Sequence, residues 1–144
     1  MTALVIDASV AIKWFLPECH SINAIRLLNA GYELVAPDLI ISECGNVLWK
    51  KWLRQELEPG VIPVLLADLC RMNLRIVPAY SLIDEASRIS ITWRRSFYDS
   101  IYLALAVACN CRMVTADEKL CNALKDTPME EHVVLIGEMT TPRE

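Results

Sequence analysis

The segment Ala3-Leu4-Val5-Ile6-Asp7, near the start of the chain, decides how the rest of the sequence is interpreted. Its apolar run is short and partly β-branched, too brief for a helix, and predicts a buried strand that ends at Asp7. Similar short apolar runs recur along the chain, and stretches with helical spacing separate them. Strands that alternate with helices are typical of a parallel sheet with right-handed crossovers.

The same reading predicts the remaining elements of one α/β domain. Further strands are expected at 34–36, 74–77, 112–115 and 132–136, and helices at 8–15, 21–29, 38–55, 59–72, 81–93, 98–110 and 117–124. Asp38 is expected to cap its helix, and helix 98–110 is so apolar on all sides that it must be buried. We therefore predict a single domain over residues 1–144, with a central, mostly parallel sheet of about five strands flanked by helices.

Composition excludes several classes of protein. With 54% apolar residues, 22% charged residues and a net charge of −4, the chain is too apolar for intrinsic disorder and too acidic to coat nucleic acid. No membrane-spanning run or signal peptide is visible, which favours a cytoplasmic protein. Six scattered cysteines without a Cys-x-x-Cys pair are expected to be buried, reduced thiols rather than disulfides or zinc ligands: Cys19, Cys44, Cys70, Cys109, Cys111 and Cys121.

Four acidic residues fall where the expected fold would direct them inward. Asp7 and Asp117 follow strands, and ligands of open α/β sheets bind beyond the carboxyl ends of strands. Glu43 lies at the edge of an apolar helical stripe, with Asn46 one turn on and able to orient it, and Asp99 opens the most apolar helix. Each has a purely structural alternative. Asp7 and Asp117 would cap helices, Asp99 would complete a capping box with Ser96, and Glu43 would meet an internal Arg or Lys.

Such a set of acids favours a metal site. Clustered carboxylates repel one another and persist when a cation neutralises them, and all-oxygen ligation suits Mg²⁺ or Mn²⁺. Paired divalent ions promote the in-line displacement of phosphodiesters. We expect the four acids to converge, with carboxylate oxygens of Asp7, Glu43 and Asp99 within reach of one metal position, and Asp117 able to act through water.

Four segments around these acids form a recognisable series: Val5–Ser9, Ser42–Leu48 with its Glu-x-x-Asn spacing, Tyr98–Ala106, and Val114–Leu120 with its Thr-x-Asp-x-x-Leu spacing. In this order they resemble the motifs of the PIN-domain family of metal-dependent ribonucleases, and particularly its VapC-type toxins. The resemblance covers essentially the whole chain. Ser100 departs from it, since the family usually has Ala there, but the change leaves the acids intact.

The resemblance implies an Mg²⁺- or Mn²⁺-dependent endoribonuclease, the toxin of a toxin–antitoxin pair, with RNA as substrate, a small antitoxin as partner and a homodimeric state. Two alternatives stay open: a housekeeping RNA-processing nuclease without an antitoxin, and a non-catalytic module that binds RNA or protein. The resemblance assigns metal binding and catalysis to Asp7, Glu43, Asp99 and Asp117, with Ser9, Asn46 and Thr115 as supporting polar residues.

Basic residues are candidates for contacts with RNA phosphates. They are Lys13, Arg94 and Arg95, near the acids in sequence, and Lys50, Lys51 and Arg54, beyond Glu43. Arg94 fits solvated surface better than a phosphate contact, and Lys13 does not. A modest patch of this kind binds the RNA backbone and carries little sequence information. Trp49 and Trp52 are expected to serve packing or an interface rather than base stacking.

Overall fold

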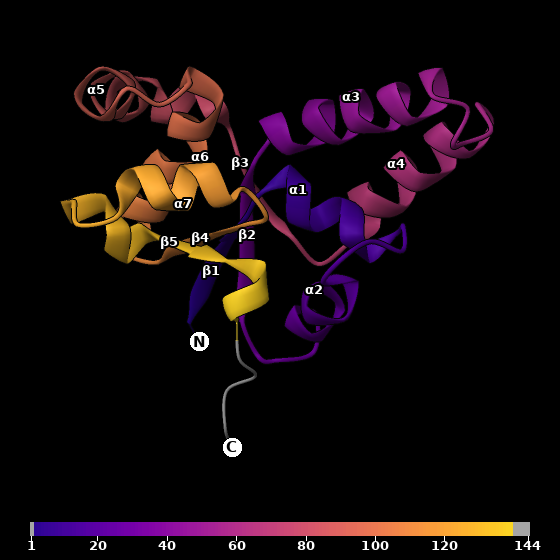
Figure 1. Cartoon of the computed structure of the whole chain (residues 1–144), viewed down its shortest axis with the longest axis horizontal. Coiled ribbons are helices and arrows are strands. Elements are labelled where there is room, and N and C mark those ends of the chain that lie inside the picture. The colour runs from indigo at the N-terminus through magenta and orange to yellow at the C-terminus, as the bar shows by residue number, and fades with distance from the viewer. Residues whose placement is uncertain (1, 140–144) are drawn as a thin grey trace.

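The computed structural model describes residues 2–139 and has an α/β fold (Figure 1). Its strands are β1 (Ala3–Ile6), β2 (Glu33–Pro37), β3 (Arg75–Val77), β4 (Arg112–Thr115) and β5 (Val133–Leu135). Its α-helices are α1 (Ala8–Ala11), α2 (Ser21–Leu27), α3 (Leu39–Leu53), α4 (Val61–Arg71), α5 (Ile83–Trp93), α6 (Phe97–Ala108) and α7 (Glu118–Leu124). Every expected strand and helix is present, although helix 8–15 becomes 3₁₀ from Ile12, and helix 81–93 follows a 3₁₀ turn at Ala79–Leu82.

The strands form one parallel sheet in the order β3-β2-β1-β4-β5. Val5 of β1, for example, lies opposite Val35 of β2 on one side and Met113 of β4 on the other. The chain builds the sheet outward from β1, first to one side and then to the other. The polypeptide therefore leaves the neighbouring strands β1 and β4 in opposite directions, which makes a switch point at their carboxyl ends. The predicted five-stranded sheet is confirmed, and it is parallel throughout.

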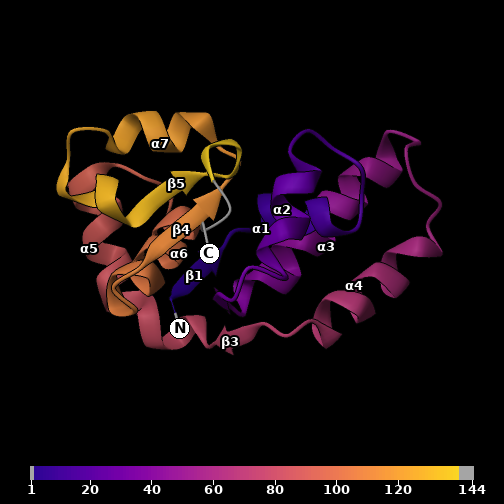
Figure 2. The same cartoon turned by 90° about the horizontal axis from the view of Figure 1, so that it is seen from below.

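Helices cover both faces of the sheet (Figures 1 and 2). Helices α1 to α4 lie on one side, and α5 to α7 lie on the other. This division follows from right-handed crossovers, because the direction of strand addition reverses after β3. The ends of α1 and α6 that carry acids consequently approach the same edge of the sheet from its two faces.

Helix α6 is the most buried element, as its composition predicts. It contacts β1, β2 and β4 on one side and α5 on another, so the whole run Ser100–Ala106 is buried. The buried Ser100 hydroxyl donates a hydrogen bond to the Ser96 carbonyl oxygen at 2.8 Å and is therefore not left unpaired. Because α6 is held against the sheet, its first turn, which contains Asp99, is directed toward the ends of the central strands.

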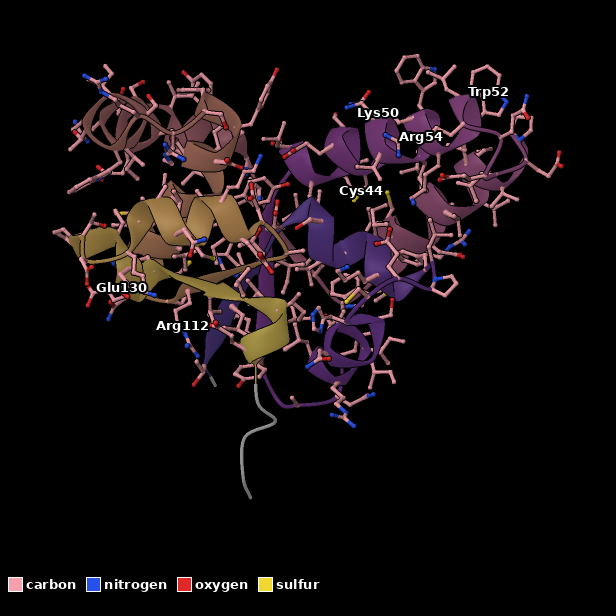
Figure 3. The ribbon with its side chains drawn as sticks, in the orientation of Figure 1. Cys44, Lys50, Trp52, Arg54, Arg112 and Glu130 are labelled. Atoms are coloured by element: carbon pink, nitrogen blue, oxygen red, sulfur yellow. The ribbon has the colours of Figure 1, made fainter. Side chains whose placement is uncertain are left out.

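Helices α3 and α4 form an arm that extends away from the sheet (Figure 1). The buried positions of α3 are Ile40, Cys44 and Leu48, a narrow stripe, and Cys44 lies on the side of α3 that faces α1 and α4 (Figure 3). Trp49 and Trp52 are 48% and 41% exposed. Packing within the chain therefore covers only part of each side chain. The exposed part is free for the other expected role, contact with a partner.

Asp38 differs from its expected role as a helix cap. Its side chain makes no capping hydrogen bond to α3. Instead, Oδ1 accepts a hydrogen bond from the Ala79 N–H at 3.0 Å, while the Asp38 N–H donates to the Val77 carbonyl at 2.9 Å. Asp38 thus joins the end of β2 to the 3₁₀ turn after β3, because the first N–H of that turn has no partner within the turn.

All six cysteines are free thiols, so the expected absence of disulfides is confirmed. Their expected burial is correct for Cys44 but wrong for Cys19 and Cys70, which are exposed. Cys19 lies in the loop before α2, and Cys70 lies on α4, whose only buried residue is Leu69. Within residues 2–139, no helix is both long enough and apolar enough to cross a membrane.

The contact between α3 and α4 gives a first prediction. The nearest atom to a Cβ placed at Gly45 is Leu66 Cδ1 at 3.7 Å, an ordinary van der Waals contact. Alanine favours a helix interior over glycine by about 0.5–1 kcal/mol. We expect Gly45→Ala to raise the free energy of unfolding by about that amount in urea denaturation. Gly31→Ala is the control and should lower it, because Gly31 has φ of +80°. A destabilised Gly45→Ala would contradict the open packing between these helices.

Candidate metal centre

Asp7 lies at the switch point between β1 and β4. Its N–H donates to the Val114 carbonyl at 3.1 Å, which continues the pairing of the two strands by one step. Its side chain does not cap α1. Instead, Oδ2 accepts hydrogen bonds from Ser9 Oγ at 2.7 Å and Thr115 Oγ1 at 2.8 Å. The alternative in which Asp7 serves as a helix cap is therefore wrong.

The two hydroxyls that bind Asp7 are themselves oriented by the backbone after β4. Ser9 Oγ accepts a hydrogen bond from the Ala116 N–H at 3.1 Å, and Thr115 Oγ1 accepts one from the Asp117 N–H at 3.1 Å. Each hydroxyl oxygen is thus occupied as an acceptor, so its proton is directed to Asp7. Burial raises the pKa of Asp7, the hydrogen bonds from Ser9 and Thr115 oppose the rise, and the negative charge of Asp117 adds to it.

Asp117 combines a structural and an electrostatic role. Its Oδ1 accepts a hydrogen bond from the Leu120 N–H at 3.2 Å and so caps α7, which confirms the cap alternative for this residue. Its charge nevertheless reaches the site, because it raises the pKa values of Asp7 and Asp99. The cap holds the Asp117 carboxylate at the end of β4, beside the other acids.

Asp99 stands in the first turn of α6, where half of the expected capping box with Ser96 is formed, since the Asp99 carboxylate makes no hydrogen bond back to the Ser96 N–H among the described residues. The cap is Ser96, whose Oγ accepts a hydrogen bond from the Asp99 N–H at 3.1 Å. Burial is the main cause that raises the pKa of Asp99, and the charges of Asp7 and Asp117 raise it further. Ser96 and the positive charge of Arg95 act in the opposite direction. Asp99 is therefore partly shielded from water and faces two other carboxylates.

Glu43 reaches the same acids from α3. Burial is the main cause that raises the pKa of Glu43, and the negative charges of Asp7 and Asp99 raise it further. The neighbouring Tyr102 hydroxyl opposes this rise. Among the described residues, Glu43 forms no ion pair with Lys or Arg, so the internal ion-pair alternative is wrong. Its buried Oε1 also has no hydrogen-bond partner within that part of the chain. An unpaired buried carboxylate oxygen is costly and marks a place where a ligand would be stabilised.

Tyr102 is a component of the site that the sequence patterns did not single out. Its side chain is fully buried, and its hydroxyl lies beside Glu43 without reaching hydrogen-bonding geometry, so it too lacks a partner in the range described. Burial, followed by the charges of Asp7 and Glu43, raises its pKa. The available clue was position: Tyr102 is three residues after Asp99, and therefore on the same face of α6.

The four acids thus act on one another, but they do not close around a single point. Within residues 2–139, no three His, Cys, Asp or Glu side chains are placed so that they could hold a metal ion. The structure therefore differs from the expectation that Asp7, Glu43 and Asp99 already share one metal position. Mutual repulsion of carboxylates favours such spreading.

The site nevertheless fits a hard divalent cation. Its side-chain donors are carboxylate oxygens, the ligands that a hard cation prefers. Cys44, which follows Glu43 in its motif, lies instead against the Ala8 carbonyl oxygen, 4.0 Å from its Sγ. Glu43 Oε1 lacks a partner within residues 2–139, and the pKa values of Asp7, Glu43 and Asp99 are raised by neighbouring negative charge as well as by burial. A cation bound between the carboxylates would give Glu43 Oε1 a partner and would neutralise the repulsion among the acids.

An open cleft of about 400 Å³ adjoins Glu43, between α3 and the start of α6. Its lining residues are Leu39, Ser42, Glu43, Asn46, Val47, Lys50 and Tyr98. Asn46 lines this cleft and, within the part of the chain that the structure describes, makes no hydrogen bond to Glu43. It therefore does not orient Glu43 in the way that the sequence led us to expect. The amide is exposed because its turn of α3 faces the cleft rather than the sheet.

Two of the predicted phosphate-binding lysines are engaged elsewhere. Lys13 is buried, and its Nζ lies 2.7 Å from the Cys19 carbonyl oxygen and 3.7 Å from Glu18 Oε1. Lys51 Nζ lies 3.2 Å from Glu18 Oε2. Glu18 therefore draws both cations to the loop before α2, and the structure does not support the expected contact between Lys13 and RNA phosphates.

The other basic residues remain candidates for RNA contacts. Lys50 lines the cleft, and Arg95 lies close enough to Asp99 to lower its pKa. Arg54 ends α3 on the arm, near Trp52 (Figure 3). Arg94 follows α5 in a left-handed conformation with φ of 53°. It is exposed, as expected for a residue of the solvated surface.

Comparison with known proteins agrees with the motifs. The PIN domain model matches residues 4–125, a span that contains all four acids. Ribonuclease VapC3 of Pyrobaculum aerophilum is 29% identical over 119 residues, which cover 81% of this chain and 91% of that protein. Ribonuclease VapC9 of Mycobacterium tuberculosis is 32% identical over 117 residues, which cover 81% and 87%, respectively.

A solved structure supports the fold independently. A chain of the toxin–antitoxin complex from Klebsiella pneumoniae matches with a TM-score of 0.63 at 17% identity, covering 94% of this chain and 99% of that chain. At this identity the likeness concerns the fold alone. The family-model match, the relatives and the parallel sheet with its switch-point acids agree, and the chain belongs to the PIN-domain family.

Proposed function

We propose that this protein is a metal-dependent endoribonuclease and the toxin of a type II toxin–antitoxin pair. The observation that carries the proposal is the set of four acids at the switch point, whose negative charges add to the burial that raises the pKa values of Asp7, Glu43 and Asp99. Membership of the PIN-domain family and the two VapC ribonuclease relatives support RNA as the substrate. We expect it to act in the cytoplasm.

The proposed metal ligands are Asp7, Glu43, Asp99 and Asp117. PIN-domain nucleases generally depend on divalent metal ions, and an all-carboxylate site favours Mg²⁺ or Mn²⁺. When bound, such an ion supplies an activated water molecule and neutralises negative charge that develops on the phosphate.

The chain's own residues supply orientation. Ser9 and Thr115 both donate hydrogen bonds to Oδ2 of Asp7. Two such bonds fix the orientation of the Asp7 carboxylate, whereas a single bond would let it rotate. Tyr102 lies beside Glu43, where a small rotation would let its hydroxyl donate to the carboxylate. Burial of Asp7 excludes water from that side of the site and strengthens its electrostatic interactions.

The proposed protein partner is a small antitoxin. An acidic site has a direct inhibitor in a basic side chain inserted among the carboxylates, and Arg suits this best because its planar fork binds carboxylates bidentately. Exposed Trp49 and Trp52 on the arm offer apolar contacts beyond the site. The similarity of fold to a chain of a toxin–antitoxin complex supports this assembly. A homodimer is proposed as well, and exposed Ile83 and Ile91 of α5 offer it an apolar surface.

Activity provides the direct test of the metal site. Asp7→Asn and Asp99→Asn should each reduce RNA cleavage by more than about a hundredfold, since even residues that only orient metal ligands contribute about 10- to 100-fold. EDTA should stop the wild-type enzyme, and Mg²⁺ or Mn²⁺ should restore it. Asp126→Asn is the matched control, because Asp126 is exposed beyond α7, and should keep full activity. Full cleavage by Asp7→Asn in EDTA would refute the proposed site.

Thermal stability tests the charge cluster separately from cleavage. The pKa of Asp99 is raised in the folded state, so the stability that it contributes is complete below its ordinary value of 3.8 and is lost as pH rises through the folded value. Asp99→Asn removes this repulsion while keeping the Ser96 cap. In EDTA near pH 7 the variant should melt at or above the wild-type temperature, and added Mg²⁺ should raise the wild-type Tm more than the variant's. Equal Mg²⁺ shifts would contradict metal binding by Asp99.

Growth distinguishes a toxin from a housekeeping nuclease. Expression of the wild-type chain alone should slow growth, Asp99→Asn should not, and co-expression of the partner encoded beside it should restore growth. The physical basis is displacement of the cation by the partner's basic side chain. If both forms are equally harmless and no small protein co-purifies, the toxin assignment fails and the housekeeping nuclease becomes the better explanation.

A further inference from the structure

The cleft beside Glu43 contains polar and aromatic groups that the metal centre does not use. They come from two elements, α3 and the first turn of α6, that are far apart in sequence. Because Glu43 forms part of the cleft wall, a molecule in the cleft would lie directly against the acids.

Tyr98 is the aromatic residue of this cleft. It is 62% exposed, although the run that begins two residues later is entirely buried. Its hydroxyl makes no hydrogen bond within the described residues, so the ring is not held for a structural purpose there. An exposed aromatic face next to a nucleolytic site is a stacking surface for an unpaired base, and this interaction tolerates any base.

Lys50 supplies the positive charge of the cleft. It lies seven residues after Glu43 on α3, a separation of about 10 Å along the helix. Unlike its neighbour Lys51, which pairs with Glu18 and Glu56, Lys50 forms no ion pair among the residues described. A free ammonium group at that distance from the acids suits a phosphate adjoining the one that is cut, and it offsets the repulsion between RNA and the carboxylates.

Asn46 lies between Glu43 and Lys50 in sequence, one turn before Lys50. Its amide is exposed and offers both a donor and an acceptor to a base edge. Ser42, one turn before Asn46, adds a hydroxyl on the same wall. The cleft thus presents an aromatic face, a cation and an amide, which are the three kinds of group that recognise a single nucleotide.

We propose that this cleft is a subsite for one unpaired nucleotide next to the scissile phosphodiester, with its base stacked on Tyr98, its phosphate bound by Lys50 and its base edge contacted by Asn46. The inference rests on the proposed ribonuclease function and assigns Tyr98, Lys50 and Asn46 as the residues that bind the substrate beside the scissile bond. A base in a duplex is already stacked and cannot lie on Tyr98, so paired RNA is excluded from this subsite.

The binding test uses the cleavage-inactive Asp7→Asn protein with Mg²⁺ and a fluorescein-labelled single-stranded RNA of eight mixed nucleotides, followed by anisotropy. Adding Tyr98→Ala should raise Kd at least about fivefold, and Tyr98→Phe should restore the affinity, because the ring is retained. Adding Lys50→Gln should raise Kd and reduce the slope of log Kd against log salt by about 0.7. A duplex of the same sequence should bind more weakly, with no effect of Tyr98→Ala.

Matched controls are available on other surfaces. Tyr80 is 87% exposed on the turn before α5, and Lys125 is exposed after α7. Tyr80→Ala and Lys125→Gln should leave Kd unchanged. Unchanged affinity in both Tyr98→Ala and Lys50→Gln would overturn the subsite, as would failure of Tyr98→Phe to restore binding. A loss of antitoxin binding alone, with RNA binding intact, would assign the cleft to the protein partner and also overturn it.

Kinetics in the otherwise wild-type enzyme separate this inference from the proposed function. Tyr98→Ala and Lys50→Gln should raise KM for single-stranded RNA several-fold with a smaller effect on kcat, since they remove binding rather than catalysis. If the wild-type enzyme cleaves RNA in an EDTA-sensitive manner but these KM values do not move, only the subsite is wrong. If the wild-type enzyme cleaves no RNA with any divalent ion, the ribonuclease function itself is wrong.

Discussion

The parallel pairing of β1 with β4 is the constraint on which the site depends. Because the chain leaves these neighbours toward opposite faces, an opening forms at their shared ends. Asp7 extends the pairing through its N–H bond to Val114 and accepts a hydrogen bond from Thr115 across the same two strands. A shift in this register would separate Asp7 from the end of β4 and remove both the opening and its supporting hydroxyl.

Negative charge concentrated at that opening explains much of the protein's chemistry. Burial raises the pKa values of Asp7, Glu43 and Asp99, and each is raised further by another acid. Hydroxyl donors to Asp7 offset part of this cost, whereas the buried Glu43 Oε1 has no such donor among residues 2–139. The site therefore favours whatever positive charge reaches it, whether a divalent ion or the basic side chain of a partner.

Helix α3 connects this charged centre to the outside. Its residues point in three directions: Cys44 packs toward α1, Glu43 and Lys50 line the cleft, and Trp49 is about half exposed to solvent. One helix can do this because successive residues are 100° apart, so a buried stripe, a polar wall and an apolar outer face fit within fifteen residues. Substrate and protein partner would thus meet adjacent faces of the same element.

The sequence by itself determined the strands, the helices, the buried character of α6 and the positions of the four acids at strand and helix ends, because these features depend on local periodicity and local capping. Only the tertiary structure decided which distant groups became neighbours. Lys13 pairs with Glu18 rather than standing free for a phosphate, and Tyr102 rather than Asn46 acts on the Glu43 carboxylate. Such outcomes depend on how separate elements pack, and a side chain's partner is the nearest group in space, which spacing along one helix or strand does not specify.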